Sequence, residues 1–239
     1  MKIAQQIIFL LIVMIITLIL CTLATWWNWN NQITDVQLDD IFFYILPDLS
    51  HIEYPITNYI ILGQMLFSLL SLEYNHMFQY IAQYIFLQCI LSSLRALTVS
   101  MTILPNIHVY EFCTKEVDHF FQAFAYMIRY GSCGDYMFSG HTASAFTLYM
   151  IVHKHATNEL WKVLSGIFLG AQILFLLLLR WHYSIDIVVA IIISWFIFRL
   201  YKRYETQDKW FYFSEFILSK NSKSISQVRS TIRTSRVVF

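Results

Sequence analysis

A histidine and an aspartate four residues apart stand where two strongly apolar runs meet. His182 and Asp186 lie where the apolar run 160–179 meets the apolar run 185–200, and Arg180 comes just before them. If the chain from 181 onward is helical, this spacing puts the imidazole and the carboxylate on one face. A carboxylate there keeps one ring nitrogen protonated and leaves the other as a base or nucleophile. The alternative is a His–Asp pair that caps the start of a helix.

A second group of polar residues precedes another apolar run. Asp135 and Tyr136 are followed by Ser139, Gly140 and His141, so an imidazole stands close to the start of a predicted span. A single histidine in such a place is more often structural. With a Ser-Gly pair directly before it, however, hydrogen-bonding groups are gathered at one point, which favours a site over a lone core residue.

Arg95 is the strongest candidate for binding phosphate, because its guanidinium is a planar fork of donors that stays charged. The alternative is a structural partner for an interior carboxylate or helix end. Arg95 belongs to a polar stripe within the apolar run 77–104. Lipid cannot satisfy such side chains, so we expect the stripe to face the interior of a helix bundle. Its members are Gln79, Gln83, Gln88, Ser92, Arg95, Thr98 and Thr102.

The composition is that of an integral membrane protein. Of 239 residues, 58% are hydrophobic and only 13% are charged, whereas soluble domains have roughly 25% charged residues. A net charge of +1 gives no reason to expect nucleic acid as a partner. We predict an all-α fold with one six-span catalytic membrane domain at 1–204. Residues 205–239 should form a cytosolic tail, at first interfacial and then disordered.

Six apolar runs predict six transmembrane helices joined by polar connections, with 28–55 and 105–135 as the longer loops. The runs are 7–24, 56–72, 77–104, 136–152, 160–179 and 181–200. Lysine and arginine gather on the side that holds both termini, which places both termini in the cytosol by the positive-inside rule. The opposite face then receives Asp48, Asp135, His141, Arg180, His182 and Asp186.

That convergence on one face favours a catalytic site over scattered helix caps. Cys113 and Cys133 fall on the same side. A disulfide is permitted there if the compartment is lumenal or extracellular, and the sequence leaves the pairing open.

These motifs resemble those of the sphingomyelin synthase family, a branch of the lipid phosphate phosphatase superfamily. Residues 133–135 and 139–142 are similar to its first catalytic motif, and 182–190 to its second. Arg95 with Thr98, Thr102 and 104–105 resembles its third-span motif, and 46–48 most of its first-loop motif. Lys202 stands where the family usually has histidine, and the double arginine expected before the third span is absent.

The resemblance implies transfer of a phosphocholine or phosphoethanolamine headgroup from a glycerophospholipid to ceramide, which releases diacylglycerol. His182 would attack phosphorus to form a phosphohistidine, Asp186 would orient it, and His141 would serve as acid and then base. No metal, nucleotide or other cofactor is implied. The residues implied in substrate binding are Arg95 and Arg180 for phosphate, Ser139 and Gly140 beside it, and Asp135, Asp48 and Tyr136 for a cationic headgroup.

Other readings of the same residues stay open. The chain could be a hydrolase of lipid phosphates that uses water, an inositol phosphorylceramide synthase, or a transporter or scaffold without catalysis. A zinc site from His141, His182, Cys133 and Asp186 is disfavoured, because no close Cys/His pair sets a ligand spacing. The family implies a Golgi, endoplasmic reticulum or plasma membrane location with the site on the lumenal or extracellular face. A homo-oligomer is compatible with the sequence.

Overall fold

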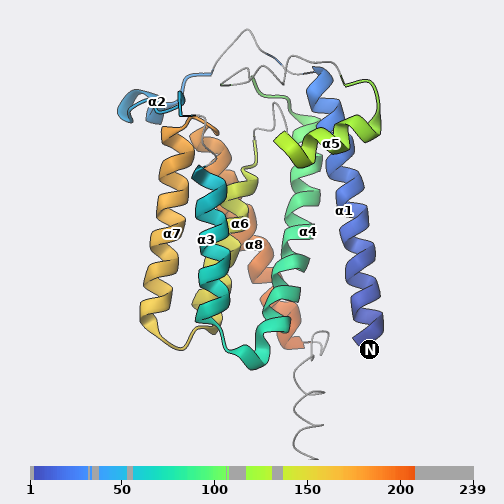
Figure 1. Ribbon diagram of the computed structural model, residues 1–239, viewed down its shortest axis with the longest axis vertical. Coiled ribbons are helices and arrows are strands. Elements are labelled where there is room, and N and C mark those ends of the chain that lie inside the picture. Colours follow the sequence, from blue (N-terminus) through green and yellow to red (C-terminus); the bar gives the residue numbers. More distant parts are fainter. Residues whose placement is uncertain are drawn as a thin grey trace, which may run out of the picture.

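The structure is a computed structural model that describes residues 3–31, 33, 38–52, 56–105, 107, 117–130 and 137–207. Six long helices run side by side and make up the body of the molecule (Figure 1). They are α1 (Ile3–Asn31), α3 (Ile56–Ser71), α4 (Met77–Met101), α6 (Gly140–His155), α7 (Glu159–Leu178) and α8 (Ser184–Gln207). The described residues contain no strand, which confirms the all-helical prediction.

Four of these helices are long and apolar enough to cross a membrane: Ile7–Asn31, Met77–Met101, Glu159–Leu178 and Ser184–Arg203. The helix Ile56–Ser71 is apolar but shorter. At about 1.5 Å per residue, a 16-residue helix such as α3 or α6 is shorter than the roughly 30 Å hydrocarbon core. The chain is thus an all-α membrane protein, whereas six crossings with cytosolic termini stay a prediction.

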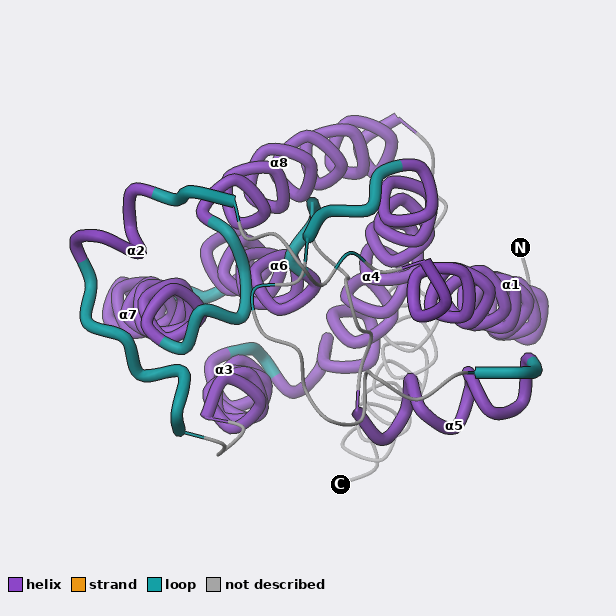
Figure 2. Tube along the Cα trace, turned by 90° about the horizontal axis from the view of Figure 1, so that it is seen from above, coloured by secondary structure: helices purple, strands orange, loops and turns teal. Residues whose placement is uncertain are grey.

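Helix α6 occupies the centre of the bundle, in contact with α3, α4, α7 and α8 (Figure 2). Small side chains allow α6 to occupy this central position, since Ala143 and Ala145 are almost fully buried and let neighbouring backbones approach closely. The amide of Gln64 on α3 donates to the carbonyl of Ala145 at 2.9 Å. Helix α1 lies further out, against α4 and the short helix α5 (Phe120–Tyr130).

The polar stripe of α4 does face the interior along its middle. Gln83 is buried, and Gln88, Ser92 and Arg95 line a cavity. Thr102 lies beyond the end of the helix and is exposed, because α4 ends at Met101. The stripe therefore belongs to the bundle interior except at its ends.

Two short helices replace parts of the segments that the sequence suggested were loops. Helix α2 (Ile41–Ile45) and helix α5 (Phe120–Tyr130) lie across one end of the bundle (Figure 1). Helix α5 packs on α1, with the rings of Trp29 and Tyr126 5.2 Å apart. Helices this short depend on such contacts, so their local sequence signal is weak. A 3₁₀ turn, η1 (Tyr74–His76), precedes α4 at the other end.

Helices α6 and α8 begin later than the apolar runs suggested. Helix α6 starts at Gly140, not 136, because Ser139 caps it by accepting from the amide of Thr142 at 3.2 Å. Helix α8 starts at Ser184, not Trp181. A Schellman turn ends α7, with Arg180 at φ 52° in the left-handed region and its amide bonded to Leu177.

Several predicted features lie outside the described residues. They are Asp135, Tyr136, the Cys113–Cys133 pair and the tail from 208 onward.

Asp40 joins residues 38–52, here called the outer segment, to the start of α8 and should contribute measurably to stability. One carboxylate oxygen accepts from the amide of Phe42 at 2.9 Å, and the other from the amide of Ser184 at 2.6 Å. Asp40→Ala would leave both amides without this partner, and we expect a loss of about 1 kcal/mol. Thermal unfolding of the detergent-solubilised protein measures this loss of stability. Asp39→Ala is the control, since Asp39 is exposed; equal losses would contradict the assignment.

Candidate active site

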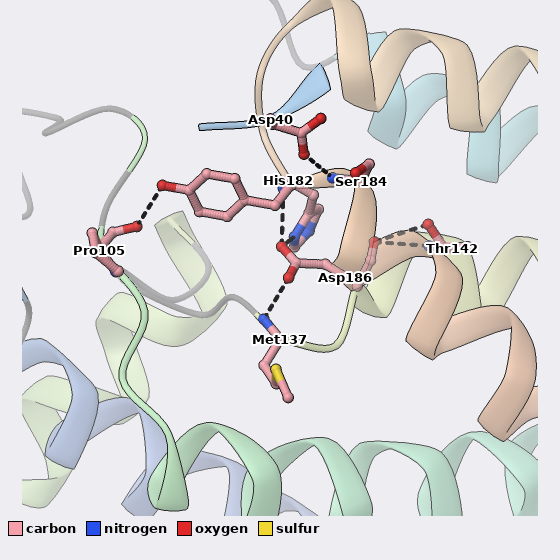
Figure 3. Close-up of polar contacts among 9 residues, drawn as sticks. Asp40, Pro105, Met137, Thr142, His182, Ser184 and Asp186 are labelled. Carbon is pink, nitrogen blue, oxygen red and sulfur yellow. Dashed lines mark hydrogen bonds and ion pairs between the residues drawn. The ribbon is translucent and has the colours of Figure 1, made fainter. Parts of the chain in front are cut away.

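His182 and Asp186 form a buried pair at the start of α8 (Figure 3). Nδ1 of His182 lies 3.2 Å from Oδ2 of Asp186, and the two residues are 6% and 0% exposed. His182 precedes the helix and Asp186 sits in its first turn, so the contact forms across a helix start and not along one face. Since a carboxylate only accepts hydrogen bonds, Nδ1 carries the hydrogen and the ring's lone pair lies on Nε2.

Asp186 also fixes the backbone around it. Its Oδ2 accepts from the amide of Tyr183 at 3.0 Å, and its Oδ1 accepts from the amide of Met137 at 2.7 Å (Figure 3). The amide of Ser139 in turn donates to the Asp186 carbonyl at 3.3 Å. Asp186 therefore ties the cap of α6 to the start of α8, and the two motifs become parts of one structure.

His141 comes from the first turn of α6 and faces the same end of the bundle. Its ring centroid is 6.5 Å from that of His182 and 5.8 Å from that of Trp181. Its Nε2 lies 2.7 Å from Oδ1 of Asn58, on the first turn of α3. A proton donor reaches about 2.6–3.2 Å and a near-attack contact is about 3–3.5 Å, so the two rings can flank a single phosphorus.

Arg95 lies against the first residue of α6. A Cβ built on Gly140 would be 2.8 Å from Nη1 of Arg95, so the guanidinium packs directly on this glycine. The start of a helix attracts anions through its dipole and its first amides. Arg95 and the start of α6 thus place positive charge one residue from His141.

A cavity of about 520 Å³ opens beside Arg95 and His141, among α1, α3, α4 and α6, and neither His182 nor Asp186 is among its lining residues. Its polar lining includes Asn58, Gln88, Ser92, Arg95, His141 and Ser144, and its apolar lining includes Leu62, Met65, Leu91 and Val99. Ser144 donates to Gln88 at 3.1 Å. Among the described residues that line it, none is Asp or Glu. The cavity therefore offers an anion site beside an apolar volume that suits lipid chains.

Tyr183 joins two neighbouring segments to the start of α8. Its hydroxyl donates to the Pro105 carbonyl and accepts from the Leu38 amide, both at 3.2 Å. Burial raises the pKa of Tyr183 above its usual value, so the phenol stays protonated and keeps donating at neutral and mildly alkaline pH. The segment after α4 and the outer segment are thereby held against the start of α8.

Asp48 and Arg180, which the sequence suggested for substrate binding, contact each other. Nη1 of Arg180 is 3.1 Å from Oδ2 of Asp48, and Nη2 donates to the Phe43 carbonyl at 3.3 Å. The Arg180 guanidinium also lies over the Phe43 ring at 5.1 Å. Neither residue of the pair lines the cavity. Contact with substrate stays a prediction for both.

The sequence did not single out Asn58 or Asp40. Asn58 was visible only as a polar residue early in an apolar run, and Asp40 only as one of several acids in a loop. Their roles depend on partners 83 and 144 residues away. Within the described residues, no group of three His, Cys, Asp or Glu side chains could hold a metal ion, and Cys133 lies outside that part.

Comparison with known proteins finds a family similarity over the segment that contains these residues. Residues 132–203, which hold both histidines and Asp186, match the family described as PAP2 superfamily C-terminal. Over this part of its length, the chain is similar to sphingomyelin synthase-like proteins of the lipid phosphatase superfamily. The predicted family resemblance is therefore confirmed.

Three relatives illustrate the similarity, and the chain spans from about a fifth to about half of their length. The human phosphatidylcholine:ceramide cholinephosphotransferase 2 is 30% identical over 64 residues, 26% of this chain and 18% of that protein. An Oryza sativa subsp. indica phosphatidylinositol:ceramide inositolphosphotransferase is 36% identical over 58 residues, which are 24% of this chain and 18% of that protein. Sphingomyelin synthase-related 2 of Caenorhabditis elegans is 30% identical over 181 residues, 69% of this chain and 55% of that protein.

Gly140 should be required because Arg95 occupies the space of a side chain. Gly140→Ala would push the Arg95 guanidinium away, and a shift of about 1 Å at a site can cost roughly 100-fold. We expect activity on phospholipid to fall roughly 10- to 100-fold while thermal stability changes little. Gly170→Ala on α7 is the matched control, since a Cβ added there would meet no neighbouring atom within 4 Å. Equal activity in both variants would remove Arg95 from the site.

Proposed function

We propose that the protein transfers a phosphate-containing headgroup from a glycerophospholipid to ceramide and releases diacylglycerol. The observation that carries this proposal is the approach of two imidazoles, at 6.5 Å between centroids, beside Arg95 and a cavity with an apolar wall. The human and rice relatives are named for phosphocholine and phosphoinositol transfer to ceramide. They support the reaction class, although the chain spans only 18% of each by alignment.

In the first half-reaction, Nε2 of His182 attacks the phosphorus of the donor. The bond from phosphorus to the diacylglycerol oxygen breaks, and that oxygen takes a proton from His141. Asp186 holds the Nδ1 hydrogen of His182 and stabilises the positive charge on the phosphorylated ring. Arg95 balances the charge on the phosphate oxygens. The products are diacylglycerol and a phosphohistidine that keeps the headgroup.

In the second half-reaction, His141 takes the proton from the primary hydroxyl of ceramide. The hydroxyl oxygen attacks phosphorus, the bond from phosphorus to His182 breaks, and His141 is protonated again for the next turnover. Asn58 suits this cycle, because a protonated ring has two N–H groups. One can donate to Oδ1 of Asn58 while the other serves the reacting oxygen.

The described lining carries no carboxylate for a cationic headgroup, and Asp48 is paired with Arg180. Choline, ethanolamine and inositol donors are therefore all to be tested. The site is proposed to lie in the lumenal or extracellular leaflet. The test uses full-length protein in liposomes with mixed phospholipid donors and labelled ceramide, and mass spectrometry identifies the product.

His182→Ala and His141→Ala should each abolish ceramide product, because one removes the nucleophile and the other the proton carrier. Both variants should still reach the membrane at normal levels. His51→Ala is the control, as His51 is exposed and distant in sequence from both motifs. Normal product from either site variant would refute the mechanism.

Omitting ceramide separates a transferase from a hydrolase. In ceramide-free liposomes, a phosphohistidine that waits for an acceptor limits diacylglycerol release to about one molecule per protein. Continued release would show that water accepts the headgroup. That outcome would replace transfer by hydrolysis and leave the roles of the two histidines in place.

Asn58→Leu should slow transfer without lowering protein abundance. The substitution keeps a similar volume but removes the oxygen that contacts Nε2 of His141, so His141 loses its fixed orientation. General acid–base catalysis contributes about 10²–10⁴-fold, and we expect a kcat loss of at least roughly tenfold. KM for the donor should change little. Asn158→Leu, at the cap of α7, is a control for amide loss elsewhere; an equal kcat in both variants would contradict the role of Asn58.

A further inference from the structure

A second cleft lies between α6 and α8, at the end of the bundle opposite the two histidines. Its volume is about 460 Å³. The part of α6 from Phe146 to Lys154 and the part of α8 from Trp195 to Lys202 form it, whereas His141 and Asp186 sit in the first turns of the same helices. Its lining residues are Phe146, Tyr149, Met150, His153, Lys154, Trp195, Phe198, Arg199 and Lys202.

The cleft has a one-sided charge. Lys154 and His153 from α6 line the same cleft as Arg199 and Lys202 from α8, and none of the described residues that line it is acidic. Glu159, a few residues past the end of α6, is held by Lys162, with 2.7 Å between Nζ and Oε1. Three permanent cations from two helices therefore line one space, and an anion that enters it would be attracted to all three.

Aromatic rings hold two of these cations in place. The Arg199 guanidinium carbon lies 5.3 Å from the centroid of Trp195, and Nζ of Lys154 lies 5.9 Å from that of Tyr201. A guanidinium over a ring face keeps its donors at its edges for a phosphate. Trp195 is itself 49% exposed, so an apolar surface continues from the charged part of the cleft.

We propose that this cleft binds the headgroup of an anionic phospholipid. The cations fit its phosphate, and the exposed Trp195 with Phe146 and Met150 fits the start of its acyl chains. A basic pocket between membrane helices is a recognised way to bind such headgroups. The site goes beyond the proposed transfer reaction, because it lies towards the opposite ends of α6 and α8 from the histidines. A bound headgroup would also link the far ends of the helices that position both histidines.

A general excess of positive charge at this end of the bundle would not by itself bring three cations into one cleft. The positive-inside rule concerns charges near the ends of spans and asks for no common cavity. Arg203 provides the comparison within the chain. It is exposed, lies next to Lys202 on the same helix and carries the same charge, yet it does not line the cleft. Binding in the cleft should depend on Arg199 and Lys202 and not on Arg203.

The experiment titrates the full-length, detergent-solubilised protein with dioctanoyl phosphatidic acid and follows thermal unfolding and the apparent Kd. Dioctanoyl phosphatidylcholine is the neutral lipid, and glycerol 3-phosphate is the same headgroup without chains. We expect phosphatidic acid to raise Tm and to bind more weakly as salt rises. Arg199→Gln with Lys202→Gln should weaken binding roughly 10- to 30-fold. Arg203→Gln should bind like the unaltered protein.

Three results would overturn the proposal. Equal weakening by Arg203→Gln would show a diffuse surface charge, and equal binding of glycerol 3-phosphate would show a site for a free phosphate compound. No shift with phosphatidic acid would show no site. If the double variant does not fold, Lys202→Gln alone serves, since Lys202 is exposed near the end of α8. The transferase assay is separate, so failure here leaves the proposed reaction untouched.

Discussion

The carboxylate of Asp186 is the point on which the rest of the site depends. A fully buried carboxylate is costly unless its oxygens are satisfied, and this one contacts an imidazole and two backbone amides. One amide belongs to Met137, which has a positive φ of 80°, a conformation that a non-glycine residue rarely adopts. The same interaction that orients His182 therefore also holds the strained approach to α6, from which His141 follows.

The bundle explains why two histidines 41 residues apart in sequence lie next to each other. Helix α6 is central because its small residues allow four neighbours to approach, and its first turn faces the start of α8. Arg95 then fills the space that Gly140 leaves on the α4 side. Positive charge and a helix start thus lie beside His141 at the cavity, with the His182 ring next to that of His141.

The outer segment works as a brace and not as part of the cavity. Asp40 holds the first amide of α8, Tyr183 joins the segments at Leu38 and Pro105, and the Arg180–Asp48 pair fastens the turn after α7. Charged residues at a membrane edge are candidates for function by default. Here Asp48 and Arg180 satisfy each other, so their charge alone does not mark a substrate contact.

The sequence by itself determined the class of protein, the six apolar runs and the candidate triad of His141, His182 and Asp186. Composition, local spacing and a short motif carry that information, because a membrane span and a His–Asp pair are encoded within a few turns of chain. The sequence also indicated that Arg95 faces the interior of the bundle, since lipid cannot satisfy the polar stripe to which Arg95 belongs.

Only the tertiary structure decided which groups meet across the bundle. Asn58 reaches His141, and Asp40 reaches Ser184, through contacts that no local pattern encodes. The late starts of α6 and α8 follow from a serine cap and from a left-handed Arg180, where apolar composition predicted helix. Helices α2 and α5 form because they pack on longer helices. The pairing of distant residues depends on how the helices pack, and one chain's periodicity does not contain that packing.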